Sequence, residues 1–377
     1  MTKAARLASE RARLESQRSG AENWRLWGPY LAERAWGTVR EDYSHDGEAW
    51  GSFSYEQACS RAYRWSEDGL GGISDEQQRL CFALALWNGR DRMLKERAFG
   101  LTGDQGNRGE DVKEYYFYRD ATPSHSWLSY LYKYPQCAFP HDRLVEENAR
   151  RSRHEPPFTL LDTGAFNENR YFDVEVLTAK ASPDEIHIRI VAANRGREAA
   201  ELHLLPTLWF RNTWSWSSDS AKPSIRATDP PDGCAWAVEA AHPELGRYWL
   251  YGRQGGELLF TENESNAELL WGQPNAAPYV KDAFHRRVIE GAQDAVNPAR
   301  AGSKFAIWTQ VLLASEARAE IDLVLAARPM VSPFKRSDAV FADRESEADE
   351  FYRELLPVAD GDDRAIVRQA LAGSLRS

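Results

Sequence analysis

Residues 171–210 read YFDVEVLTAKASPDEIHIRIVAANRGREAAELHLLPTLWF. The stretch predicts three consecutive β-strands, over residues 171–180, 185–194 and 199–210. Turn residues separate them, Ser-Pro-Asp at 182–184 and Asn-Arg-Gly at 194–196. Between residues 186 and 191, apolar and polar side chains alternate, which is typical of a strand with one buried face.

The same pattern continues on both sides of this stretch. Further strands are predicted at residues 78–87, 111–119, 126–134, 234–240, 247–251, 257–261, 304–313 and 319–326. Helices are predicted at residues 2–17, 142–153, 281–290, 337–355 and 362–375. Many strands followed by helices at the end predict a mainly β fold, in which a β-sandwich leads into an α-helical element.

Composition argues against several classes of protein, including those that bind nucleic acid, anionic membranes or metals. The 377 residues carry a formal net charge of −10 without a basic block, which argues against nucleic acid and anionic membranes as partners. The first 20 residues are charged throughout and lack the apolar core of a secretory signal. The 4 cysteines lie far apart, which favours buried thiols and a cytoplasmic protein. The 8 histidines lack metal-ligand spacing and no nucleotide-binding motif occurs, so neither a metal nor a cofactor is expected.

Aromatic residues are unusually frequent, with 14 Trp, 15 Tyr and 15 Phe. Large β-sandwiches are rich in aromatic residues, and composition alone favours that explanation. The alternative is that ring faces stack on sugars while nearby carboxylates and amides bind the hydroxyl groups. The densest group, between Trp24 and Trp50, alternates rings with charged side chains, so it fits either an oligosaccharide-binding surface or a buried aromatic plug.

Five motifs carry a family resemblance. They are WGPYLAERAWGTVREDYS at residues 27–44, SRAYRWSEDGLGGISD at 60–75, GNRGEDVKEYYFY at 106–118, LYKYP at 131–135 and LLPTLWFRNTWSW at 204–216. With these motifs, the chain resembles the large bacterial proteins of glycoside hydrolase family 63. That family is typified by processing α-glucosidases and is related to mannosylglycerate hydrolases.

The resemblance implies an architecture of two parts, an N-terminal β-supersandwich and a C-terminal (α/α) toroid. It implies an N-terminal helix at residues 1–20, the supersandwich at 21–330, and a helical linker with the start of the toroid at 331–377. Residues 368–373 (RQALAG) resemble the start of the first toroid helix, so the chain is expected to be truncated there.

In the family, the toroid carries an Asp as general acid and a Glu as general base, and hydrolysis inverts the anomeric centre. Neither carboxylate has a matching position here, so no catalytic residue is expected in this chain. The resemblance places the WGTVR signature, residues 36–40, near the mouth of the toroid. The expected substrate-binding residues are Trp36, Arg40, Glu41, Asp42, Tyr43, Trp65, Glu67 and Asp68.

Three functions follow as alternatives. The first is the N-terminal part of an inverting α-glycosidase that acts on oligosaccharides or glucosides, partnered by the toroid and inactive without it. The second is a stand-alone β-sandwich that binds a carbohydrate or another partner without catalysis. The third is a complete hydrolase whose fold brings carboxyl groups such as those of Asp42 and Asp68 to about 6.5–9.5 Å from each other, across an open cleft.

Overall fold

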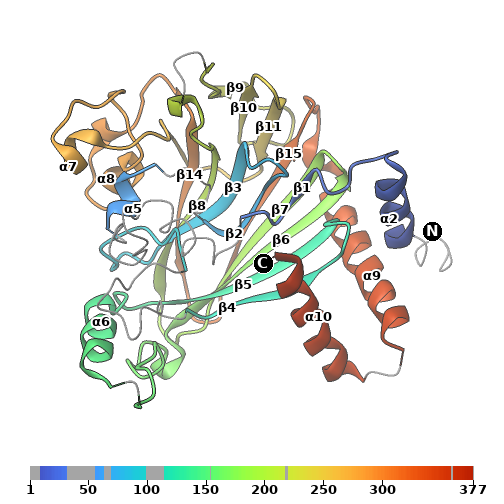
Figure 1. Cartoon of the computed structure of the whole chain (residues 1–377), viewed down its shortest axis with the longest axis horizontal. Helices are drawn as coiled ribbons and strands as arrows, with labels where there is room; N and C mark the ends of the chain where they lie inside the picture. The colour runs from blue at the N-terminus through green and yellow to red at the C-terminus, as the bar shows by residue number, and fades with distance from the viewer. Residues whose placement is uncertain are drawn as a thin grey trace.

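The computed structural model describes residues 9–31, 56–62, 69–98, 114–152, 154–216, 220–357 and 360–376. Two antiparallel sheets dominate these ranges (Figure 1). One has six strands in the order β1-β2-β3-β8-β14-β12, and the other has nine in the order β13-β9-β10-β11-β15-β7-β6-β5-β4. The predicted mainly β, sandwich-type fold is confirmed.

The central stretch forms β6, β7 and β8, as predicted, and β8 crosses from the nine-stranded to the six-stranded sheet. The six-stranded sheet contains β1 (Trp27–Gly28), β2 (Leu70–Asp75), β3 (Leu80–Trp87), β8 (Ala200–Phe210), β12 (Glu257–Thr261) and β14 (Lys304–Leu313). The nine-stranded sheet contains β4 (Tyr116–Ala121), β5 (Trp127–Pro135), β6 (Tyr171–Ser182), β7 (Glu185–Asn194), β9 (Ser224–Thr228), β10 (Trp236–His242), β11 (Gly246–Gly252), β13 (Ala301–Gly302) and β15 (Arg318–Ala326).

Helices lie outside the two sheets. They are α2 (Ser9–Ser19), α5 (Gln57–Ser60), α6 (His141–Arg150), α7 (Ala267–Trp271), α8 (Ala283–Val288), α9 (Ser337–Leu355) and α10 (Gly361–Arg376). The helix predicted over 281–290 is shorter than expected, and the strand predicted over 111–119 is described only from Tyr116 to Ala121. None of the helices in the described ranges has the length and apolar character that crossing a bilayer requires.

The main hydrophobic core lies between the sheets. The alternation at 186–191 places Ile186, Ile188 and Ile190 of β7 in this core, opposite Leu204 and Leu208 of β8. Strand β8 is buried on both faces, because Leu205 and Trp209 belong to separate clusters beyond the core. Its nearly continuous apolar sequence is therefore explained by cover on the outer face of the six-stranded sheet.

Helix α9 covers part of the outer face of the nine-stranded sheet. Val340, Phe341 and Ala348 of α9 pack against Trp127 and Ala179. Helix α2 contacts α9, and α10 lies against the edge strand β4 (Figure 1). The division at residues 20 and 330 into an N-terminal helix, a sandwich and a helical end stays a prediction.

Lys180 at the end of β6 makes stability depend on pH. Its buried ammonium donates to the carbonyl oxygens of Trp24, at 2.6 Å, and Trp27. Burial lowers the pKa of Lys180 from 10.5 to about 7, although Glu10 acts in the opposite direction. Above pH 7 the native chain therefore holds fewer protons than the unfolded chain, so the free energy of unfolding rises with pH, by up to about 1.4 kcal/mol per unit.

Urea unfolding at pH values of about 7, 8 and 9 measures this dependence. We expect Lys180→Met to remove the rise, because methionine binds no proton. The exposed Lys335→Met serves as the control and is expected to keep it. Equal pH dependence in wild type and Lys180→Met would contradict the assignment to Lys180.

Candidate functional site

Buried charged and titratable groups gather around residues 91–98, and the part that includes Lys304 lies on the outer face of the six-stranded sheet. Residues 91–98, which follow β3, are fixed at its end by two main-chain hydrogen bonds between Leu86 and Lys95, of 3.0 and 2.7 Å. Helix α8 packs on the same face through Ala283, Phe284 and Val288. We call these charged groups, with the neighbouring thiol, the ionic cluster. Its members, all buried, are Cys59, Asp91, Lys95, Glu96, Arg97, Glu114, His141, His285 and Lys304.

Glu96 is the centre of one half of the ionic cluster. Its Oε1 lies 3.3 Å from Lys304 Nζ, and its Oε2 lies 3.7 Å from Arg97 Nη1 and 3.9 Å from His285 Nε2. Burying one carboxylate among several cations reduces the cost of removing each of them from water. This half links β14, α8 and the segment after β3.

Glu114 and Asp91 form the other half. Glu114 accepts hydrogen bonds from Lys95 Nζ, at 2.9 Å, and from the Tyr132 hydroxyl. Asp91 accepts from the Tyr134 hydroxyl and from the main chain of Phe139, at 2.6 Å. Burial raises the pKa of both carboxyls, and Lys95 opposes that rise. Each carboxylate is held by neighbouring donors, which indicates a structural role.

Cys59 and His285 affect each other's protonation. Burial raises the pKa of the Cys59 thiol, but His285 and Arg97 outweigh burial and leave this pKa below its ordinary value. Conversely, burial lowers the pKa of His285, whereas Cys59 and Glu96 raise it above its ordinary value. Both pKa shifts act in the direction of a thiolate beside an imidazolium, a combination found in nucleophilic enzymes.

Access decides what the ionic cluster can do. The cavity that touches Glu96 and Lys304 has a volume of about 10 Å³, enough for roughly one water molecule. In the described ranges, no three His, Cys, Asp or Glu side chains are arranged to hold a metal ion. Burial, with Lys95 and two arginines nearby, also lowers the pKa of His141 to about 2, so this imidazole is neutral. We conclude that the cluster positions α5 and α8 on the sheet.

All eight expected substrate-binding residues lie outside the described residues, as do the carboxylates of the third alternative. They are Trp36, Arg40, Glu41, Asp42, Tyr43, Trp65, Glu67 and Asp68. Described residues that flank them lie on the outer face of the six-stranded sheet. Leu31 packs with Ala83 and Trp209, Gly69 is close to the same two side chains, and the main chain of Ala62 donates to Ser265 Oγ at 2.9 Å.

The described tryptophans range from buried to half-exposed. Trp24, Trp27, Trp127, Trp209 and Trp236 are buried, so the packing explanation of the composition holds for them. Trp216 and Trp271 are instead 52% and 53% exposed, with Arg211 and Arg61 stacked over their rings at 5.7 and 5.8 Å. Trp216 ends a motif quoted above, whereas the sequence gives no signal that singles out Trp271.

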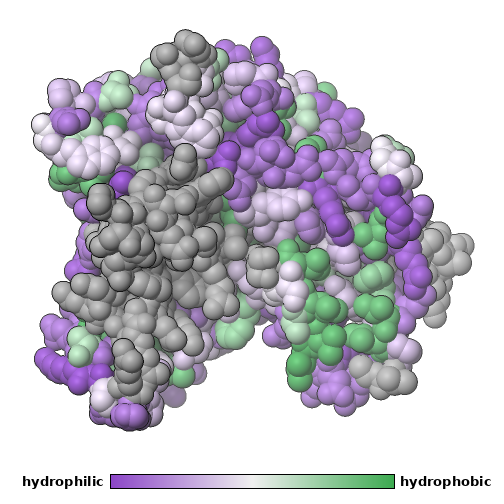
Figure 2. Space-filling model, viewed as in Figure 1, coloured by the Kyte–Doolittle hydropathy of each residue, from purple (hydrophilic) through white to green (hydrophobic). Residues whose placement is uncertain are grey.

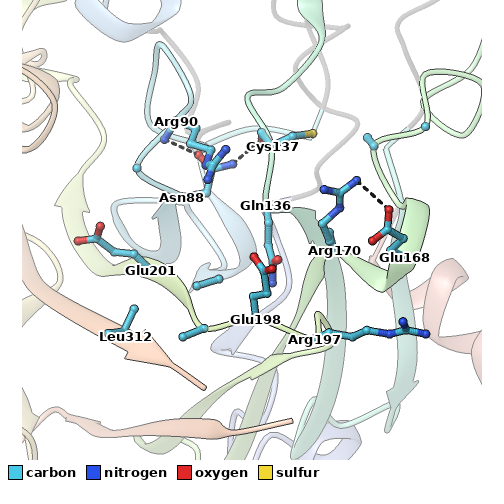
Figure 3. A pocket seen from close by; sticks show the side chains of 15 residues that line it. Asn88, Arg90, Gln136, Cys137, Glu168, Arg170, Arg197, Glu198, Glu201 and Leu312 are labelled. Carbon is cyan, nitrogen blue, oxygen red and sulfur yellow. Dashed lines mark hydrogen bonds and ion pairs between the residues drawn. The ribbon is translucent and has the colours of Figure 1, made fainter. Parts of the chain in front are cut away.

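A cavity of about 690 Å³ lies at one end of the sandwich (Figure 3). Three segments form most of its wall, namely residues 88–90 after β3, residues 164–170 before β6, and residues 197–201 at the start of β8. Its charged lining residues are Arg90, Glu168, Arg170, Arg197, Glu198 and Glu201. Sequence analysis predicted the turn at 194–196, next to one wall of this cavity, but not the cavity itself.

Comparison with known proteins gives a sequence relative in yeast. No model of a known family matches the chain. The uncharacterized protein YMR196W of Saccharomyces cerevisiae is 38% identical over 410 aligned positions that include 97% of this chain. This chain spans only 38% of the length of that relative.

Two solved structures show a remote similarity. A putative aldose 1-epimerase from Escherichia coli K12 matches 55% of this chain and 67% of its own, at 10% identity and a TM-score of 0.25. A putative kojibiose phosphorylase from the human microbiome matches 54% of this chain and 21% of its own, at 7% identity and a TM-score of 0.24. Both names are those of sugar-processing enzymes, but neither protein superposes on this chain as a whole.

Proposed function

We propose that the chain is the β-sandwich part of a larger inverting α-glycosidase that acts on oligosaccharides or glucosides. In this proposal the chain is inactive alone, because the acid and base belong to an (α/α) toroid outside it. The observation that carries the proposal is the alignment with the yeast protein, which includes nearly the whole chain but little more than a third of the relative. The motifs resembling glycoside hydrolase family 63 supply the enzyme class.

Helix α10 supports the proposed contact with a toroid. Its inner face is held against the sandwich, where Ala372 is buried and Arg368 is ion-paired with Asp120. Its outer face leaves Ile366 65% exposed, and Figure 2 shows hydrophobic side chains gathered over this helix. Exposed apolar surface of this kind favours a further layer of helices, which the toroid would provide.

The outer face of the six-stranded sheet is the proposed substrate side. The described residues that flank the expected substrate-binding segments lie there, and the ionic cluster gives this face a rigid base. The half-exposed indoles of Trp216 and Trp271 can stack on sugar rings. All four cysteines are free, which fits the proposed cytoplasmic location.

Hydrolysis assays test the proposal on two proteins, this chain and the full-length yeast relative. With α-linked glucosides and mannosides, we expect the relative to release monosaccharide. This chain should be slower by about 10⁴-fold or more, because general acid and general base each contribute roughly 10²–10⁴-fold. Clear turnover by this chain alone, or none by the relative on any substrate, would contradict the proposal.

A further inference from the structure

We propose that the 690 Å³ cavity at the end of the sandwich is a binding site for a neutral oligosaccharide, separate from the proposed substrate side. The choice of a sugar rests on the proposed function, whereas the site itself rests on the lining of the cavity. Its volume falls within the range of roughly 300–1,000 Å³ found for small-molecule sites.

Charge balance in the cavity favours a neutral ligand. The lining holds three arginines and three glutamates, so no net charge selects an anion or a cation. Guanidinium groups only donate hydrogen bonds and carboxylates only accept them. A sugar hydroxyl does both, so it can accept from an arginine and donate to a glutamate of the same cavity.

Two of these groups are available to a ligand. In the described part of the chain, neither the Arg90 guanidinium nor the Glu198 carboxylate has an ion-pair partner, whereas Arg170 is paired with Glu168 at 3.5 Å. Figure 3 shows Arg90 and Arg170 on opposite sides of the space with Glu198 between them, and Arg197 extending away. Opposite charges that share a cavity without touching leave room for hydroxyl groups between them.

A buried hydrogen-bond network fixes the positions of Arg90 and Glu198. Asn88, which is 5% exposed, donates to the carbonyl oxygens of Pro135 and Cys137 at 2.9 and 2.8 Å. Its own side-chain oxygen accepts from the main chain of Arg90 at 3.0 Å. The side-chain amide of Asn194 likewise donates to the main-chain carbonyl oxygen of Glu198 at 2.7 Å. Preorganised backbones of this kind reduce the entropy lost on binding.

Apolar atoms complete the site without aromatic stacking. Ala165, Ala199 and Leu312 line the cavity, and Leu312 is 74% exposed. Their methyl groups can contact the C–H faces of a sugar. Because no aromatic ring is among the described residues that line the cavity, we expect weak binding that depends on hydrogen bonds.

Direct binding to this chain, measured by calorimetry and ligand-detected NMR, tests the inference without any hydrolysis. The probes are maltotetraose, an α-linked mannotetraose, tetragalacturonate and inorganic phosphate. We expect at least one neutral probe to bind, and the double variant Arg90→Gln/Glu198→Gln to lose about tenfold or more in affinity. The control Glu15→Gln/Arg18→Gln removes an exposed pair on α2 and should bind as wild type does.

Three results would overturn the inference. They are the absence of binding by both neutral probes, unchanged affinity in the Arg90→Gln/Glu198→Gln variant, and preference for tetragalacturonate or phosphate. Loss of binding in both double variants would also count against it, because the effect would then not belong to the cavity. If this chain binds a neutral probe in the cavity but the yeast relative hydrolyses no substrate, the result supports this site and rejects the proposed function.

Discussion

Replacing Glu114 with alanine is expected to lower the free energy of unfolding by about 3–5 kcal/mol. The Glu114 carboxylate lies 2.9 Å from Lys95 Nζ, and the two side chains are 0% and 2% exposed. It also accepts a hydrogen bond from the buried Tyr132 hydroxyl. Alanine would leave both donors in a buried site without this acceptor, and the cost of burying the Lys95 charge would no longer be offset. Urea unfolding followed by tryptophan fluorescence measures the loss.

Two further variants separate this effect from a general sensitivity to charge removal. Glu56→Ala removes a carboxylate 3.0 Å from Arg92, but both side chains are about half exposed, so we expect a loss below about 1 kcal/mol. The double variant Lys95→Met/Glu114→Leu removes both buried charges and should recover much of the loss. If Glu114→Ala and Glu56→Ala cost the same, the Lys95–Glu114 pair of the ionic cluster does not stabilise the sandwich.

Replacing Asp120 with asparagine is expected to release α10 from the sandwich. Both carboxylate oxygens of Asp120 accept hydrogen bonds from Arg368, one of them at 3.1 Å, and the two side chains are only 11% and 16% exposed. Asparagine keeps the shape but removes the charge and one acceptor. A charged hydrogen bond contributes about 1.5–3 kcal/mol, so the helix should detach about 30-fold more often. Limited proteolysis of the segment that joins α9 to α10 measures this detachment.

Asp349 provides the matched control for the ion pair between Asp120 and Arg368. Its carboxylate also binds Arg368, at 2.5 Å, but is 48% exposed. We therefore expect Asp349→Asn to increase cleavage by less than about fivefold. Cleavage at the wild-type rate in Asp120→Asn would show that the ion pair does not hold α10. A matching fall in the stability of the whole sandwich would show that α10 is not released separately.

Sequence patterns identify most of the strands, including the five-residue β12, but not the two-residue β1. The alternation around Ile188 and the turns that bound β6 to β8 are local, so they can be predicted without knowledge of the fold. Strand β1 has only two residues, and it exists because Trp27 and Gly28 pair with Asp75 and Ser74. No local pattern marks such a strand, since its hydrogen bonds come from residues distant in the chain.

Long-range topology also explains why the described sites were not predicted. The run Lys95-Glu96-Arg97 has the composition of an exposed surface, and only its position beside β3 makes it buried. The cavity at the end of the sandwich arises because β8 lies between β3 and β14, which brings Arg90, Glu198 and Leu312 together. The expected substrate-binding residues came from a family resemblance, and the described residues do not test them.

The stereochemical course of hydrolysis tests the central claim most directly. Proton NMR of the anomeric region can be recorded while an α-linked glucoside or mannoside is mixed with the full-length yeast relative, and separately with this chain. Our account predicts that the β-anomer appears first with the relative and that no monosaccharide appears with this chain. Initial formation of the α-anomer, or release of sugar by this chain alone, would contradict it.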